Sequence, residues 1–541
     1  MNSELTKKII EKIFPEKLPT LEELEEKYPP RNLPDSAMVT RICPSPTGFM
    51  HLGGIYMSLL CKKFADQTDG VFYLRIEDTD KKRELQGAKE IIYSSLKDYD
   101  LLYDKNPKYG PYVQSERKDI YISYVKYLFS KGDAYLCFCT EEELKAATEK
   151  QEKLHLKRGY YGEWAIWRNK TEDVVLAELD KETPYIIRFK SHGDCEKTFI
   201  HHDLLKGNVS LPENDMDIVI LKRDGLPTYH LAHVVDDHLM RTTDVLRGDE
   251  WLSSIPVHYD LVQSLGFDSI RYGHISPINK MDGSSRRKLS KRKDPEANVA
   301  FFKDKGFVVS AVIEYLLNLA NSNFEDWRKE NPKKDYTEFN LTIEKLAKSN
   351  GPLYDEMKLR DIAKEKIALM TSEKVFEYVL IWAKDYDKYF YNLLNSNSEY
   401  WHKIFNIERG GDSIRKDIAI WSEVYDFYKF FDVEKFVRTD WGNFKSVFST
   451  DEIKDILTEY KALYNESDDK QAWLSKVKDL CTKFGLAPDI KAYKADREAF
   501  KGHVGELTQV IRYAVTGRTQ SPDIYEILQI LGIEEVTKRL S

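Results

Sequence analysis

An alternation of strands and helices near the N-terminus is the pattern that most restricts the fold of this chain. Residues 38–42 (MVTRI) read as a short strand, residues 44–54 as a loop rich in proline and glycine, and residues 56–66 as a helix. VFYLRIED (71–78) alternates like a half-buried strand, and residues 83–99 have helical spacing. This order predicts a doubly wound, Rossmann-like α/β domain with a parallel sheet, whose ligands bind at the carboxyl ends of the strands.

An irregular stretch, residues 110–215, interrupts the alternation of strands and helices, and the end of the chain is helical. AYLCFC and YIIRFK are candidate strands within the irregular stretch. MDIVILKRDGLPTYHLAHVVDDH (216–238) then reads as strand, tight turn at Asp224-Gly225 and helix, and DVLRGDEW (244–251) as a strand running into a helix. The tail holds four amphipathic helical segments: VVSAVIEYLLNLA, KVFEYVLIWAKDY, DEIKDILTEYKALY and IYEILQILGIEEVTKRL. We expect an N-terminal helical extension (1–37), a catalytic domain in two halves (38–109 and 216–300), an inserted domain (110–215), a helical domain (301–370) and a helical C-terminal region (371–541).

The composition fits a large folded protein in a reducing compartment. The chain has 541 residues, 42% of them apolar, with 33 Tyr, 25 Phe and 9 Trp, which is enough for several cores. No apolar run reaches the roughly 20 residues that cross a bilayer, so we expect no membrane association. The N-terminus lacks the apolar core of a secretory signal, and six scattered cysteines do not form a disulfide framework. We therefore expect a cytoplasmic protein.

Two short motifs carry the chemistry. His51-Leu52-Gly53-Gly54 lies where the first strand turns into a helix, so that backbone can approach a nucleotide and the helix start can offer N–H groups to phosphate. Within residues 286–293, six of eight side chains are cationic, around Lys288-Leu289-Ser290-Lys291-Arg292. Such a loop could stabilise a leaving pyrophosphate, although the net charge is −8. Steric turn glycines and a solvated surface run are the plainer explanations of each motif alone.

Together these motifs resemble the two signatures of class I aminoacyl-tRNA synthetases. TRICPSPTG, LRIEDTD, GPYVQSER, DGLPTYHLA, VVDDHLM and VLRGDEW resemble segments of the glutamyl member, and YAVTG…SPDIYEILQILG resembles the end of its bacterial type. The resemblance runs from residue 38 to the last residue and is weaker in 330–500. It implies ligation of L-glutamate to glutamate tRNA through a glutamyl-adenylate, with ATP and Mg²⁺, an acceptor-binding insertion and an anticodon-binding helical tail. It also implies a monomer.

The resemblance implies roles for individual residues. His51, Lys288 and Lys291 would be catalytic, acting on the phosphates. ATP would be bound by His51, Gly53, Gly54, Glu250, Lys288, Leu289, Ser290 and Lys291. Glutamate would be bound by Arg41, Ser45, Glu77, Tyr229, His233 and Arg247, with the arginines for carboxylate and Glu77 for the ammonium. Transfer RNA would meet Arg286, Arg287, Arg292, Arg512 and Arg518, although solvated arginines on a helix would look the same.

Two departures from the family pattern stand out. His233 follows PTYHLA where an asparagine is expected, so the contact near the substrate α-group is in doubt. Cys137-Phe138-Cys139 and Tyr160 begin like the zinc site of some members, but Trp164 stands where a further cysteine is expected. Two thiols and a phenol fall short of four zinc ligands unless His155 joins them, so we expect no metal bound to the protein.

Other functions remain to be weighed against this one. A non-discriminating enzyme would also charge glutamine tRNA, and the difference lies in anticodon-reading residues that one sequence does not identify. A glutaminyl enzyme would be expected to carry a β-barrel tail. A non-catalytic RNA-binding relative would be expected to have lost His51, Lys288, Lys291 and Arg247, and a small-molecule nucleotidylyltransferase would not need the helical tail.

Overall fold

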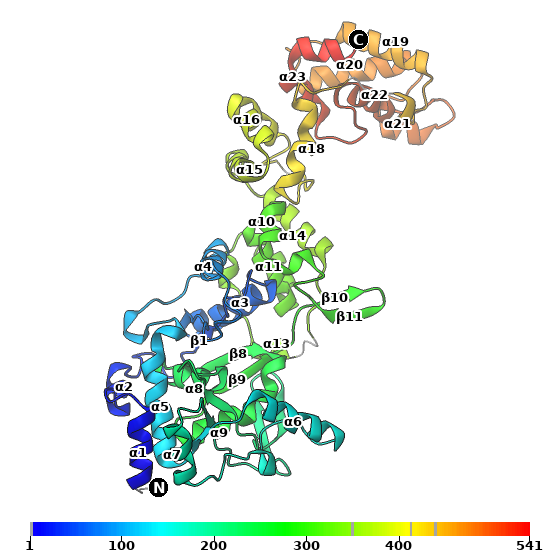
Figure 1. Cartoon of the computed structure of the whole chain (residues 1–541). Coiled ribbons are helices and arrows are strands. Elements are labelled where there is room, and N and C mark those ends of the chain that lie inside the picture. Colours follow the sequence, from blue (N-terminus) through cyan, green and yellow to red (C-terminus); the bar gives the residue numbers. More distant parts are fainter. Residues whose placement is uncertain (1–3, 348–350, 412–413, 438–440) are drawn as a thin grey trace. The chain divides into compact units, whose positions relative to one another are not determined.

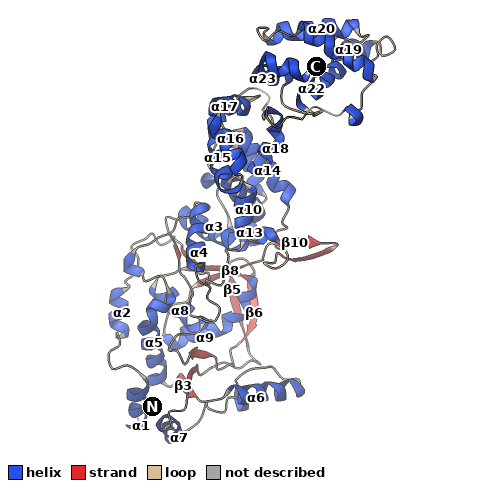
Figure 2. Cartoon of the chain, turned by 45° about the horizontal axis from the view of Figure 1, so that its top comes forward, coloured by secondary structure: helices blue, strands red, loops and turns tan. Residues whose placement is uncertain are grey.

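The computed structural model describes residues 4–347, 351–411, 414–437 and 441–541. The chain divides into two compact units, one made of Met1–Phe301 with Ile313–Asp355, the other of Phe302–Val312 with Glu356–Ser541. Figure 1 labels their elements, and Figure 2 shows that the described strands all belong to the first unit. The predicted fold class, a mixed α/β unit followed by a helical C-terminal region, is confirmed.

Parallel strands lie at the centre of the first unit. β1 (Val39–Ile42) pairs with β2 (Val71–Leu74), and β8 (Asp244–Gly248) pairs with β9 (Arg271–Ile275), both in parallel. Thr243 joins the two pairs, because its N–H donates to the Val39 carbonyl at 3.1 Å and its hydroxyl accepts from the Val39 N–H at 2.8 Å. β1 and β8 therefore lie side by side.

Helices follow the parallel strands as the sequence pattern indicates, although several boundaries differ, and the helix predicted over 56–66 begins at Leu52. They are α3 (Leu52–Gln67), α4 (Ala88–Asp98), α8 (Tyr229–Leu239) and α9 (Ile255–Leu265). The helix predicted over residues 83–99 begins only at Ala88, because Gly87 has a φ of +79°, a left-handed conformation that a helix does not continue through. The strand predicted over residues 71–78 ends at Leu74, where the backbone turns toward Val113.

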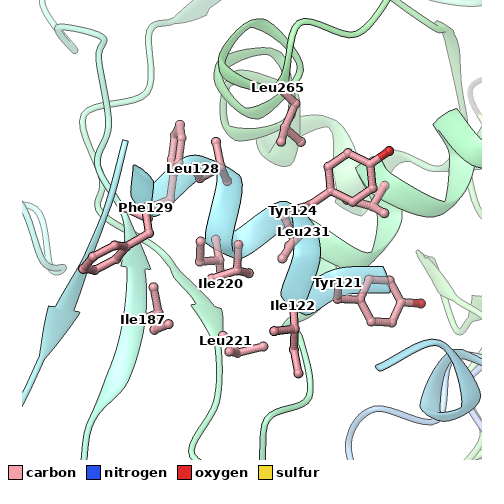
Figure 3. Packing of buried hydrophobic residues seen from close by; sticks show 14 of the residues in the cluster. Tyr121, Ile122, Tyr124, Leu128, Phe129, Ile187, Ile220, Leu221, Leu231 and Leu265 are labelled. Atoms are coloured by element: carbon pink, nitrogen blue, oxygen red, sulfur yellow. The ribbon is translucent and has the colours of Figure 1, made fainter. Parts of the chain in front are cut away.

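The region between the two pairs of strands holds an antiparallel sheet and a hairpin. β3 (Ala134–Cys137), β4 (Ile186–Phe189) and β7 (Val219–Leu221) form the sheet, and β5 (Thr198–Asp203) pairs with β6 (Gly207–Pro212). The helices here are α5 (Lys118–Lys131), α6 (Glu141–Lys153) and α7 (Glu172–Asp180). Figure 3 shows α5 between this sheet and helices α8 and α9, with Tyr124 and Leu128 buried among their side chains.

The N-terminal residues form two helices that pack on the same core. α1 (Glu4–Ile13) contacts α5 and α7, and α2 (Leu21–Lys27) contacts α5. Ile9, Leu24 and Tyr28 are buried in the cluster that includes the α5 side chains. The helices predicted for residues 1–37 are therefore present, and they pack on the first unit.

A hairpin and several helices complete the chain. The hairpin joins β10 (Asn279–Asp282) to β11 (Ser285–Lys288). Next come α10 (Ala300–Lys305), α11 (Val309–Ala320), α12 (Asn323–Glu330) and α13 (Ile343–Ala347). The later helices are α14 (Glu356–Ala368), α15 (Ser372–Tyr386), α16 (Lys388–Ser396), α17 (Ser398–Asn406), α18 (Val424–Tyr428), α19 (Thr450–Leu463), α20 (Lys470–Lys483), α21 (Ile490–Ala495), α22 (Val504–Thr516) and α23 (Ile524–Arg539). Among the described helices, none is long and apolar enough to cross a membrane.

Candidate active site

A cavity of about 530 Å³ lies at the carboxyl ends of β1 and β8. Most of the residues assigned to ATP and glutamate line it: Arg41, His51, Gly53, Gly54, Glu77, Tyr229, Arg247, Glu250, Lys288, Leu289 and Lys291. These residues come from segments far apart in the sequence, and the strand ends bring them together. The position of the cavity is that expected for a ligand site of a doubly wound sheet.

His51 caps α3 and also lines the cavity. Its Nδ1 accepts a hydrogen bond from the Gly53 N–H at 2.9 Å. Burial and the nearby lysines Lys291 and Lys288 lower the His51 pKa to about 4, so the ring is neutral at pH 7. Because a neutral imidazole carries one proton and Nδ1 is an acceptor here, Nε2 carries it. The ring therefore carries one N–H, and its hydrogen bond to the Leu289 backbone lies at the cavity wall.

Side chains in place of Gly53 or Gly54 would be tightly packed against neighbouring side chains. A Cβ at Gly53 would lie 3.1 Å from His51 Nδ1, and one at Gly54 would lie 3.0 Å from Met50 Cε. A side chain at either position would push on the capping ring or on Met50. Glycine here keeps side-chain atoms out of the part of the cavity that α3 lines, while the Gly53 and Gly54 N–H groups bond to His51.

The lysine-rich loop is held in place by Asp294. The Ser290 N–H donates to Asp294 Oδ2 at 2.8 Å, and the Arg287 guanidinium donates to both Asp294 oxygens at 2.6 and 2.8 Å. These bonds lower the pKa of Asp294 well below its usual value. The loop directs Lys291 to the Phe49 carbonyl at 3.1 Å, and Lys288 to Glu250 at 3.0 Å.

Arg41 is fixed by a buried carboxylate. Its Nε and Nη2 donate to Asp237 Oδ2 at 3.2 and 3.1 Å, and Nη2 also lies 3.3 Å from His233 Nδ1. Asp237 is fully buried and Arg41 is 5% exposed. No partner for Nη1 of Arg41 is found among the described residues, so Nη1 is the part of this cation left for a ligand.

Glu77 is held by Arg75. Arg75, fully buried, donates to Glu77 Oε1 at 3.1 Å and to Asp237 Oδ1 at 2.6 Å. Burial raises the pKa of Glu77, while Arg75 and Arg41 oppose the rise. The cavity thus contains an oriented carboxylate next to fixed arginines, which suits a ligand that carries both an ammonium and a carboxylate group.

Arg247 is surrounded by aromatic and imidazole side chains. Its Nε donates to His274 Nε2 at 2.9 Å, Nη2 donates to the Trp251 carbonyl at 3.0 Å, and Nη1 donates to the Tyr229 hydroxyl at 3.2 Å. The guanidinium also lies over the Tyr272 ring at 4.8 Å. It is 6% exposed, and that small part faces the cavity.

His233, the residue that departs from the family pattern, lies behind this wall. It is fully buried, and its Nε2 lies 3.2 Å from the Tyr272 hydroxyl. Burial and the neighbouring arginines Arg41 and Arg247 lower its pKa well below the usual value, so its ring is neutral. The structure places His233 against Arg41 and not among the residues that line the cavity.

The remaining predicted residues lie outside the cavity lining. Ser45 and Arg292 are exposed, and Ser290 accepts the Arg292 N–H through its hydroxyl. Arg286 donates to the Gly351 carbonyl. Arg512 donates to the Pro522 carbonyl at 2.7 Å, and Arg518 donates to Asp426 at 3.3 Å, so these two arginines already have contacts within the helical unit.

The cysteine pair predicted from the sequence converges on one phenol. Cys137 and Cys139 Sγ lie 3.5 and 3.4 Å from the Tyr160 hydroxyl. The Arg188 guanidinium lies 3.9 Å from the centre of the Tyr160 ring. Two thiols and one phenol beside a cation make a poor donor set for Zn²⁺, and His155 is an exposed residue.

Sequence reasoning missed the buried ions that support the cavity. Arg75 and Asp237 hold Glu77 and Arg41, and Trp251 lines the cavity beside Tyr229, with ring centres 4.4 Å apart. The available signal was the pair Asp236-Asp237 inside the apolar helix segment HLAHVVDDH, because two carboxylates on a buried helix face require cationic partners.

The arrangement can bind a nucleotide and an amino acid next to each other. Backbone N–H groups at α3, the His51 donor and two lysines suit phosphates, and fixed arginines with Glu77 suit an amino acid with an acidic side chain. Two family models match the chain: tRNA synthetases class I (E and Q), catalytic domain, over residues 37–348, and an anticodon binding domain over residues 382–541.

Relatives and solved structures point the same way. A glutamate–tRNA ligase of Clostridium beijerinckii is 45% identical over 531 residues, with 96% of each chain covered. One of Clostridium perfringens is 44% identical over 98% of each chain. A crystal structure of a glutamate tRNA ligase from Elizabethkingia meningosepticum, in complex with its amino acid, has a TM-score of 0.74 at 26% identity and covers 93% of this chain and 98% of that one. From the site and these matches, the chain belongs to the glutamate–tRNA ligase family of class I aminoacyl-tRNA synthetases.

Proposed function

We propose that this chain uses ATP to join L-glutamate to the end of glutamate tRNA in the cytoplasm. The observation that carries the proposal is one cavity lined by Arg41, Glu77 and Arg247 together with His51 and the two lysines of the loop. The relatives' names give the reaction class, and the cavity supplies groups of the required charge. Six free cysteines are consistent with a reducing compartment.

In the first step the glutamate α-carboxylate oxygen attacks the α-phosphorus of ATP, and the bond to pyrophosphate breaks. His51 donates its Nε2–H to a phosphate oxygen, and Lys288 and Lys291 neutralise the charge that gathers on pyrophosphate. Mg²⁺ would supply further charge neutralisation on the ATP oxygens and would take few protein ligands. This chain contributes positioning and electrostatics, because neither this step nor the transfer to tRNA that follows it needs a protein nucleophile.

In the second step a ribose hydroxyl at the tRNA terminus attacks the acyl carbon, and AMP leaves. The glutamate side-chain carboxylate pairs with arginine in the cavity, and Glu77 addresses the ammonium group. A glutamine amide would leave an arginine unpaired in a buried site, so glutamine should be rejected. Arg286, Arg287 and Arg292 near the loop and Arg512 and Arg518 in the tail are proposed tRNA contacts.

The test is aminoacylation with labelled glutamate, ATP and Mg²⁺, with purified glutamate tRNA and glutamine tRNA offered separately. Charging of glutamate tRNA alone supports the proposal. Charging of both would identify the non-discriminating form. Charging of neither by the folded protein would contradict the proposed function.

A further inference from the structure

A chain of three buried polar side chains runs from Arg247 away from the cavity. Arg247 Nε donates to His274 Nε2 at 2.9 Å, and His274 Nδ1 lies 2.5 Å from Asp203 Oδ2. Both His274 and Asp203 have side chains that are fully buried, and neither lines the cavity. Arg247 therefore links this pair to the proposed glutamate site.

The fold brings these residues together through strand register. Arg247 and His274 are direct partners in the parallel pair β8–β9, so their side chains leave the same face of the sheet. Asp203 ends β5 and reaches this face because the next residue, Leu204, donates its N–H to the Tyr272 carbonyl at 2.8 Å. A Cβ at Gly273 would lie 3.3 Å from Leu204 Cβ, so the glycine permits this close approach.

The hydrogen bonds fix the state of the imidazole. Arginine is only a donor, so His274 Nε2 must be the acceptor, and the ring proton is on Nδ1, where it donates to Asp203. Asp203 is held in turn by the N–H groups of Leu205 and Lys206, each at 2.9 Å. If Asp203 were absent, the proton could move to Nε2 and meet the Arg247 N–H, donor against donor.

The same contacts argue against a metal at this cluster. His201, Asp203 and His274 have donor atoms within 4.8 Å of one another, which is close enough to hold an ion. The Arg247 cation at 2.9 Å from His274 would oppose an ion, and the His274 nitrogen that faces Asp203 carries the ring proton. His201 Nδ1 is also engaged, 2.8 Å from the Tyr259 hydroxyl.

We propose that His274 and Asp203 are positioning residues for glutamate: they hold the Arg247 guanidinium at the angle in which it receives the substrate carboxylate. This inference rests on the proposed function, because it assigns Arg247 to glutamate. The two residues lock the Nε–H, while Tyr229 and His258 contact Nη1 and the Trp251 carbonyl contacts Nη2. The guanidinium therefore has a fixed orientation at the cavity wall. The effect of His274 and Asp203 is on glutamate binding and not on ATP, whose proposed ligands are His51, Glu250 and residues of α3 and the lysine loop.

The test compares two substitutions of similar size at one position. His274→Leu removes the acceptor, while His274→Gln places an amide oxygen near the position of Nε2. We expect His274→Leu to raise the glutamate KM roughly 10- to 100-fold, the loss that corresponds to one hydrogen bond to a charged group, with little change in the ATP KM. His274→Gln should recover most of the loss, and Asp203→Ala should resemble His274→Leu.

A matched control is available in the same unit. His192 also pairs with a carboxylate, Asp260, with Nδ1 and Oδ1 3.0 Å apart, but it has no contact with Arg247. His192→Leu should leave both KM values unchanged. An unchanged glutamate KM in His274→Leu would overturn the proposal, and so would equal rises in both KM values that His274→Gln does not relieve.

Failure of the proposed function would give a different result. In that case the wild-type protein would charge no tRNA with glutamate, whatever stands at position 274. The positioning role would still be tested by the crystal structure of His274→Leu, in which we expect a displaced Arg247 guanidinium. A guanidinium in its original position would overturn the inference.

Discussion

The Nδ1 atom of His51 accepts the Gly53 N–H at 2.9 Å, so the same imidazole caps α3 and lines the cavity. We propose that the ring serves the helix through Nδ1 and a ligand through Nε2. The two roles can be separated, because asparagine and glutamine each reproduce one nitrogen of histidine.

His51→Asn retains a capping oxygen near Nδ1 but loses the distal donor, whereas His51→Gln retains a distal N–H donor and loses the cap. We expect His51→Gln to keep more of the rate of glutamate activation, and His51→Asn to keep more of the helix stability. His51→Ala should lose both, with a rate about 10²–10³-fold lower. Single-turnover adenylate formation and hydrogen exchange of α3 measure the two effects. Equal rates in the Asn and Gln variants would contradict a donor role for Nε2.

The two neighbouring cations of the lysine loop should behave differently. Lys291 lines the cavity, so Lys291→Ala should slow glutamate activation by orders of magnitude while tRNA affinity changes little. Arg292 is exposed and outside the lining, so Arg292→Ala should leave activation intact. It should weaken tRNA binding and reduce the salt slope of binding by about 1. Filter binding over a range of salt concentrations checks this. Slow activation in Arg292→Ala together with weak tRNA binding in Lys291→Ala would exchange the two assignments.

Glutamate binding should weaken in acid because of Glu77. Burial raises its pKa, and only the ionised carboxylate pairs with the substrate ammonium. As the pH falls from neutral through this raised pKa, Glu77 gains a proton and affinity is lost, so the glutamate KM should rise with falling pH. Glu77→Gln should bind weakly at neutral pH and show no such rise. If Glu77→Gln shows the same rise in glutamate KM at low pH, the rise comes from another group.

Asp237 should be essential for the stability of the first unit around β1, the strand that carries Arg41. Asp237→Asn leaves Arg41 without its buried counter-charge, whereas Arg75 keeps Glu77 and Asp236, and we expect a cost of about 3–5 kcal/mol. The control is Asp66→Asn, which removes an exposed pair with Lys62 and should cost less than about 1 kcal/mol. Hydrogen exchange of β1 and α8 peptides measures both. Unchanged protection in Asp237→Asn would contradict the buried ion network.

The N-terminal extension should stabilise the first unit through Tyr28. Its ring is fully buried, and its hydroxyl donates to the Gly110 carbonyl at 3.0 Å. Tyr28→Ala should cost about 3–5 kcal/mol, as for other large buried aromatics, and Tyr28→Phe only about 1 kcal/mol. Hydrogen exchange of α5 reports the difference. Deletion of residues 1–36 with an unchanged melting temperature and activity would contradict a structural role for the extension.

Local sequence patterns predicted the elements better than they predicted the support of the cavity. The strands at 39–42 and 244–248 and the helix after His51 follow from alternation, glycine position and helical spacing. The boundary of α4 was missed because the conformation of Gly87 does not follow from spacing alone. The hairpin β5–β6 was missed because its residues mix polar and apolar types without strict alternation.

Residues such as Arg75, Asp203 and His274 were missed for a different reason. Each acts on a residue in another segment, and neither periodicity nor a short motif encodes such a pairing. Arg41 and Glu77 could be assigned because a family motif surrounds them, whereas Asp203 lies in an irregular stretch. Sequence therefore indicates which residues face a ligand more readily than which residues hold them in place.

The ion pair between Arg41 and Asp237 also limits the order in which the chain can fold during its synthesis. The two residues are 196 positions apart, and a ribosome adding 5–20 residues per second needs about 10–40 s to pass from one to the other. During that time β1 carries an arginine whose counter-ion has not been made, so the nascent chain cannot close this part of the core. This part of the core therefore closes only after α8 has been made, and α8 follows the strands β3 to β7 in the chain.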